Sequence, residues 1–152
     1  MARLFVDNLT VIDFSYLDNG RGVVGESWIV DIELEGSLND QGMVFDFGHV
    51  KKQIKQFIDH EIDHRLLVPT KSTDCSTHIE NNQLIIEFPL ATGGIIRHQS
   101  PQDAVLLVDA QMIDSNSIAI DLQARIRQLL PDNVTEVVIN LRNEEISGAF
   151  YH

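Results

Sequence analysis

Residues 27–35 read Ser-Trp-Ile-Val-Asp-Ile-Glu-Leu-Glu, and this stretch decides the fold class. The apolar side chains of Trp28, Val30, Ile32 and Leu34 alternate with acidic ones. Because side chains on a strand point alternately to the two faces of a sheet, a period of two predicts a strand with one buried face. We therefore expect a sheet that is covered on one side and polar on the other.

The segment before this strand predicts its partner. Residues 3–17 carry β-branched and aromatic side chains in a loose alternation, which favours a long strand. Residues 18–22 then read Asp-Asn-Gly-Arg-Gly, and Asn-Gly is a strong signal for a tight hairpin turn. The two strands should therefore pair antiparallel.

Two segments show helical spacing. Over 48–66 the apolar residues recur at three- and four-residue steps, and Pro69 follows as a stop. A second helix is predicted over 115–129, with Ser115 or Ser117 as its N-cap.

Between the helices, residues 70–110 have a different character. Short apolar runs around 84–86, 94–96 and 104–108 are broken by Asn-Asn, Gly-Gly and Ser-Pro. We interpret them as a small three-stranded meander inserted at about 70–110.

After the second helix, 135–141 and 146–151 are predicted strands. The resulting class is α+β, an antiparallel sheet with two helices on one face, as a single domain over 1–152.

Composition restricts the class of protein. The chain has 152 residues, of which 43% are hydrophobic, and a formal net charge of −12. That charge would repel a phosphate backbone, and the only basic cluster, Lys51, Lys52 and Lys55, is typical of a solvated helix face, so we expect no nucleic-acid partner. No apolar run reaches the ~18–20 residues of a membrane span. The single cysteine, Cys75, rules out an intramolecular disulfide, and a cytoplasmic location is expected.

Two motifs carry a family resemblance. Residues 42–51 read Gly-Met-Val-Phe-Asp-Phe-Gly-His-Val-Lys, and 62–67 read Ile-Asp-His-Arg-Leu-Leu. They resemble the Gly-Met-Val-x-Asp-Phe-x-x-Leu-Lys and Leu-Asp-His-x-x-Leu-Asn patterns of the 6-pyruvoyl- and 6-carboxy-tetrahydropterin synthase family. The match is good over 3–68 and looser over 115–151, and it does not cover 70–110.

The resemblance implies a tunnelling fold, in which the sheets of several subunits join into a barrel. It implies a homo-oligomer with sites at subunit interfaces and a pterin-like small molecule as ligand. In that family a carboxylate anchors the ring, zinc bound by three histidines polarises the substrate side chain, and a cysteine and an Asp–His pair move protons. A lyase reaction on a dihydroneopterin-type substrate, in the pterin or queuosine-precursor pathway, would follow.

Carried over to this chain, the resemblance makes Asp63 and His64 the catalytic pair. An aspartate beside a histidine can hold its tautomer, which suits acid–base chemistry. The ring anchor falls on Asn143 without a gap and on Glu144 with one deleted residue. Glu144 is preferred, because a carboxylate can accept from both the ring N–H and the amino group of a pterin.

The resemblance assigns the zinc ligands to positions that do not carry histidine. They fall near Ser15 and on Val24 and Glu26, and no cysteine occurs over 20–23. Zinc prefers imidazole and thiolate ligands. No zinc site is therefore expected, and the chain alone is not expected to perform the complete synthase reaction.

Three alternatives stay open. The chain could be a non-catalytic pterin- or purine-binding or assembly module, or the N-terminal half of a longer duplicated synthase. A remote third is a zinc hydrolase, because residues 60–64 spell His-Glu-x-x-His, with Glu80, Glu87 or His98 as a third ligand.

Overall fold

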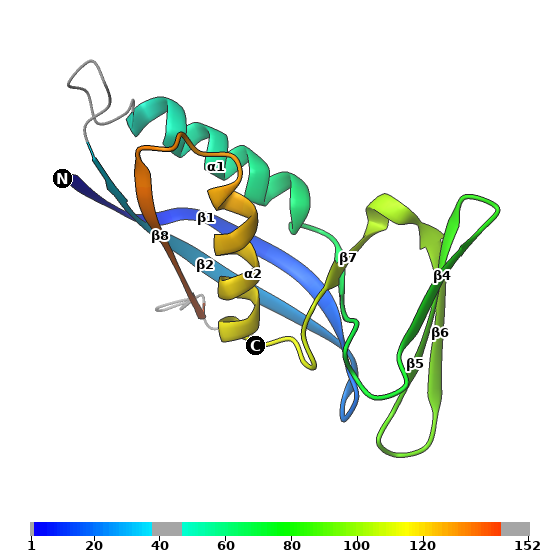
Figure 1. The fold of residues 1–152 in the computed structure, drawn as a ribbon. Coiled ribbons are helices and arrows are strands. Elements are labelled where there is room, and N and C mark those ends of the chain that lie inside the picture. Colours follow the sequence, from blue (N-terminus) through cyan, green and yellow to red (C-terminus); the bar gives the residue numbers. More distant parts are fainter. Residues whose placement is uncertain (1, 38–46, 144–152) are drawn as a thin grey trace, which may run out of the picture.

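The computed structural model describes residues 2–37 and 47–143, and these form an α+β fold (Figure 1). In chain order its elements are β1 (Ala2–Asp18), β2 (Gly22–Gly36), α1 (Phe47–Glu61), β3 (Leu66–Pro69), β4 (Ser76–Glu80), β5 (Gln83–Pro89), β6 (Ile95–Pro101), a 3-10 turn (Gln102–Ala104), β7 (Val105–Val108), α2 (Ser115–Arg127) and β8 (Val134–Asn143).

The main sheet has the strand order β7-β3-β1-β2-β8. Strands β1 and β2 form the predicted antiparallel hairpin, and β8 pairs antiparallel with β2. The sheet is nevertheless mixed, because β3 runs parallel to β1 and β7 runs parallel to β3. The wholly antiparallel sheet expected from the sequence was therefore wrong on the β3 side. Because α1 ends at Glu61, residues 66–69 are extended and pair with β1, which is distant in sequence.

Both helices lie on the same face of the main sheet, as predicted (Figure 1). The inward side chains of the hairpin, including Ile12, Val30 and Ile32, pack with Ile54 of α1 and Leu122 of α2. This burial of apolar surface is the main force that holds the layers together. Within the described residues, no helix has the length and apolar character needed to span a membrane.

Strands β4, β5 and β6 form a separate three-stranded antiparallel sheet at one end of the main sheet (Figure 1). Its apolar side chains Leu84, Ile86 and Phe88 pack against Leu17 and Val68 of the main sheet. The meander expected within 70–110 is present, but its third strand is β6. The run 104–108, assigned to the meander, instead forms β7 of the main sheet, paired with β3.

Two further boundaries differ from the sequence prediction. The N-cap of α2 is Asp114, not Ser115 or Ser117: its side chain accepts from the Ser117 N–H, and Ser117 Oγ accepts from the Asp114 N–H. The short Asp side chain performs the same capping chemistry one position earlier. The strand predicted over 146–151 lies outside the described residues.

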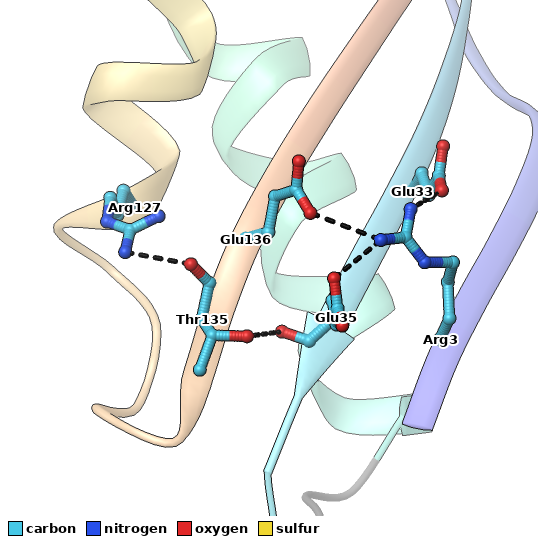
Figure 2. A network of polar contacts seen from close by, with 6 residues as sticks. All are labelled: Arg3, Glu33, Glu35, Arg127, Thr135 and Glu136. Atoms are coloured by element: carbon cyan, nitrogen blue, oxygen red, sulfur yellow. Dashed lines mark hydrogen bonds and ion pairs between the residues drawn. The ribbon is translucent and has the colours of Figure 1, made fainter. Parts of the chain in front are cut away.

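The outer face of the main sheet, opposite the helices, is polar. Figure 2 shows Arg3 of β1 among three carboxylates, those of Glu33, Glu35 and Glu136. One cation among three anions reflects the acidic composition, and because these groups are partly exposed, the pairs contribute little to stability.

A second outer-face network is centred on Asp31 of β2. Its Oδ2 accepts from Arg142 Nε of β8 at 2.8 Å, and its Oδ1 accepts from the Asn8 N–H of β1 at 2.9 Å. Asn8 has φ of +54° in the irregular stretch of β1 between Val6 and Thr10. Asp31 therefore joins three strands and holds this irregular stretch in place.

The helix-covered core predicts an asymmetry within α2. Ile126 is fully buried, whereas Ile120 is 58% exposed. Ile126→Ala should lower the free energy of unfolding by about 2–5 kcal/mol, because it leaves a cavity between helix and sheet. Ile120→Ala, the same chemical change on the outer side, should change it by less than about 1 kcal/mol. Urea denaturation at equal chain concentration measures both, and similar losses for the two variants would contradict this packing.

The Asp31 network predicts a pH dependence. The hydrogen bond from Arg142 lowers the pKa of Asp31, and burial raises it by less. The pKa of Asp31 therefore lies below its ordinary value. A carboxyl whose pKa is lowered by folding stabilises the fold above its unfolded pKa of about 4, and this stability is lost as pH falls through the lower folded pKa.

Asp31→Asn should therefore destabilise the protein at pH 7, on the order of 1 kcal/mol. The difference from the wild type should shrink below about pH 4. Denaturation series at several pH values measure it, with Asp132→Asn, an exposed carboxyl, as the control. A difference that does not vary with pH would count against an ionised Asp31.

Candidate functional site

The turn of the β1–β2 hairpin is organised by Asp18. Its Oδ2 accepts from the Gly20 N–H at 3.1 Å and from the Arg21 N–H at 2.9 Å. Gly22 has φ of +85°, a conformation that glycine adopts without strain. The sequence Asp-Asn-Gly-Arg-Gly therefore makes a defined turn that fixes the backbone of Arg21.

A pocket of about 410 Å³ opens beside this turn, and we call it the hairpin pocket. It lies where the end of the hairpin meets the end of β8 and the start of α2. Its lining residues are Tyr16, Asp18, Arg21, Glu26, Trp28, Met112, Ile113, Asp114, Ser115, Leu141, Arg142 and Asn143. Pockets of this size accommodate small ligands.

Aromatic side chains and a carboxylate give the hairpin pocket its chemistry. Tyr16 and Trp28 line it, and Phe14 lies beside both, 5.0 Å from Trp28 between ring centroids. Glu26 precedes the apolar run of β2. It shares the inward face with Trp28, because the two residues are two positions apart on the strand, with Ser27 between them. A planar apolar surface beside a carboxylate suits a flat heterocycle that carries N–H donors.

Asp63 and His64 lie in a tight turn just after α1. Asp63 Oδ1 accepts from the Asp13 N–H of β1 at 2.9 Å, and its Oδ2 lies 3.3 Å from His64 Nε2. His64 has φ of +62°, which is uncommon for a residue other than glycine, and its N–H donates to the Asp13 carbonyl at 2.7 Å. The contacts to β1 hold this strained conformation, which is frequent at functional sites.

The Asp63 carboxylate lies beside the His64 imidazole, but the structure does not bring this pair to the hairpin pocket. The His64 side chain is 79% exposed and opens into another pocket, with Asp13 and Ser15. The hairpin pocket and this His64 pocket share no lining residue. Within one chain, the proposed proton-transfer pair and the hairpin pocket are therefore separate.

The positions that the resemblance assigns to zinc do not make a metal site. Ser15 pairs with Gly25, whereas Val24 pairs with Tyr16 and Glu26 pairs with Phe14. Paired residues share a face and neighbours alternate, so Ser15 points away from the face that carries Val24 and Glu26. Valine has no ligand atom, and one carboxylate is a poor substitute for three imidazoles.

The other described residues do not supply the missing zinc ligands either. Across 2–37 and 47–143 no group of three or more His, Cys, Asp or Glu side chains is arranged to hold a metal ion. Cys75 is half-buried beside the core of the small sheet, and burial raises the pKa of its thiol, which disfavours the thiolate that binds metals.

The His-Glu-x-x-His reading fails on geometry. That motif needs both histidines on one face of a continuous helix. The helix α1 ends at Glu61, and the positive φ of His64 takes it out of helical register with His60. Residues 60–64 therefore do not form the zinc site of a peptidase.

The ring anchor falls at the edge of the described region. Asn143, one of the two positions considered, pairs with Trp28 and lines the hairpin pocket. Glu144, the preferred anchor, lies outside the described residues.

Sequence reasoning missed Tyr16, Asp18 and Arg21 as pocket residues. The alternation of β1 could have indicated them. Phe14, Tyr16 and Asp18 share the inward face, and Asp18, the first charged residue in this series, marks the end of the apolar core. The contribution of the α2 start could not be found in this way, because it depends on how the helix packs across the sheet.

The layered α+β fold, a sheet with two helices on one face, matches that of solved tetrahydropterin synthases. A family model for 6-pyruvoyl tetrahydropterin synthase matches residues 16–151. The chain belongs to this family.

Individual relatives agree with this assignment. Two proteins provisionally named 6-carboxy-5,6,7,8-tetrahydropterin synthase, from Pyrococcus horikoshii and Pyrococcus abyssi, are each 25% identical over 146 residues, which cover 94% of this chain and 82% of theirs. The structure of Plasmodium vivax 6-pyruvoyltetrahydropterin synthase superposes with a TM-score of 0.65 at 15% identity, covering 94% of this chain and 98% of that one. The Plasmodium falciparum enzyme gives the same TM-score at 14% identity.

The donor set predicts a low metal content. Protein purified without a histidine tag should contain far less than one zinc per chain, because the described residues offer no three-ligand site. Elemental analysis alongside the mass in solution measures this. About one zinc per chain that survives chelator treatment would contradict the prediction, and Glu26→Ala would then test whether that carboxylate is a ligand.

Proposed function

We propose that this protein binds a pterin, or a closely related purine-like ring, in the hairpin pocket of an oligomer. One observation carries the proposal. The end of β8 and the start of β2, to which the resemblance assigns the ring anchor and the metal-binding face, meet in one pocket lined by Glu26, Trp28 and Asn143. The provisional names of the Pyrococcus relatives point to the same class of ligand.

In this proposal Glu144 anchors the ring. A carboxylate can accept from the ring N–H and the exocyclic amino group with two separate oxygens, whereas asparagine presents one acceptor and one donor group. The aromatic side chains Tyr16 and Trp28 flank the space available to the ring. The protein would act in the cytoplasm, in keeping with its single cysteine.

Asp63 and His64 would act on a ligand held by a neighbouring subunit. The Asp63 carboxylate orients the His64 imidazole, and the exposure of His64 leaves its ring accessible to a partner surface. The pterin pocket of one chain and the proton-transfer pair of another would then form one site, which requires a homo-oligomer. Among the described residues β8 is the last strand of the main sheet, and such an edge provides a surface for assembly.

Catalysis as a synthase would be incomplete with this chain alone. The implied zinc would polarise the substrate side chain, and the donor set for it is missing. We therefore expect ligand binding to exceed catalytic competence, with lyase activity on a dihydroneopterin-type substrate weak or absent.

Pterin binding tests the proposal directly. Isothermal titration of the wild-type oligomer with neopterin should show saturable binding, and Glu144→Gln should weaken it roughly tenfold or more, because a charged hydrogen bond is lost. Glu145→Gln is the matched control, since it makes the same change one residue further on. Absence of saturable binding by the wild type, or equal affinity in all three proteins, would refute the proposal as stated.

A further inference from the structure

We propose that the hairpin pocket recognises its ligand without a metal, through the guanidinium of Arg21, and therefore selects pterins whose side chain carries a carboxylate or a similar anionic oxygen. This inference rests on the proposed pterin binding. The family resemblance implies a zinc ion at this pocket, but the described residues on the inward face offer Val24 and Glu26 there and no three-ligand set. The hairpin turn at the same pocket instead supplies a permanent cation.

Arg21 is held in place from two sides. One Nη donates to the hydroxyl of Tyr16, and Nε lies 3.7 Å from Asp18 Oδ2. The guanidinium carbon also lies 5.8 Å from the centroid of the Tyr16 ring, within the range of a cation–π contact. Because the same Asp18 oxygen accepts from the backbone N–H of Arg21, the carboxylate fixes both ends of this residue.

The guanidinium keeps donors for a ligand. It has five N–H groups in a planar fork that matches a carboxylate. Only the contacts to Tyr16 and Asp18 are made by Arg21 within the described part of the chain. The Arg21 side chain is 63% exposed, so an anionic ligand group can reach the guanidinium without any rearrangement of the protein.

The other positive groups around the pocket are already engaged. The Nε of Arg142 donates to Asp31 on the outer face of the sheet. At the start of α2, the Ser117 N–H donates to Asp114, so the helix dipole is partly offset by its own capping carboxylate. Arg21 is therefore the cation best placed to meet an anionic ligand group.

The carboxylates of the pocket give the ligand a direction. Asp18 is compensated by Arg21 and by two backbone N–H groups. Glu26 accepts from the adjacent Ser27 N–H at 3.2 Å and stays available to ligand donors. An anionic oxygen is therefore expected at Arg21, and N–H or O–H donors of the same ligand are expected at Glu26.

Binding of a carboxylated and a neutral pterin can be compared to test the role of Arg21 separately from pterin binding itself. Chelator-treated wild-type protein is titrated with 6-carboxypterin and with neutral 6-hydroxymethylpterin. The carboxylated compound should bind more tightly. Arg21→Ala should weaken it roughly 10- to 100-fold, the range expected for charge-assisted hydrogen bonds, while the neutral pterin changes by less than about threefold.

Arg21→Lys retains the charge without the planar fork and should recover part of the preference. Arg97→Ala removes the same side chain from the exposed outside of β6 and should bind both ligands as the wild type does. The mass in solution of each variant, compared with the wild type, establishes that the oligomer is intact.

Equal affinity of the wild type for the two ligands, or an equal loss for both in Arg21→Ala and Arg21→Lys, would overturn the role of Arg21 and leave pterin binding standing. A preference that disappears with chelator and returns with zinc would overturn metal-independent recognition. If neither pterin binds the wild type, both the proposed function and this inference are overturned.

Discussion

The pairing of β1 with β2 is the constraint on which the rest of the structure depends. A slip by one residue would turn every inward side chain of the hairpin to the polar face, so the Asp18-centred turn determines the core as well as the loop. The same register places Glu26 opposite Phe14 and Tyr16 opposite Val24. Core and pocket are therefore two results of one alignment.

This alignment also separates two kinds of chemistry. The inward phase of the hairpin leads to the pocket beside α2, whereas the turn that carries His64 bonds to the backbone N–H and carbonyl of Asp13, on the side of β1 where β3 pairs. The two pockets share no lining residue. Under the proposed function, joint action on one ligand would bring together groups from two copies of the chain.

Much of this could be predicted from the sequence where the pattern is local. The period-two alternation predicted the hairpin and its covered face, whereas the helix predicted to run to residue 66 ends at Glu61. The parallel strands β3 and β7 could not be predicted, because four-residue apolar runs acquire a partner only through long-range pairing. The Asp114 cap was missed because serine is as good a cap, and only the helix start decides between them.

The packing of Leu17 has an evolutionary consequence. This residue lies next to Asp18 in sequence, yet its side chain is buried on the other face of the sheet, among Leu84, Ile86 and Phe88 of the small sheet. A change in side-chain volume in β5 therefore alters the packing of Leu17, directly before the turn that carries Arg21. Substitutions in these two regions should not accumulate independently, and lineages that lengthen or lose the small sheet must re-cover Leu17 before the hairpin end can keep its shape.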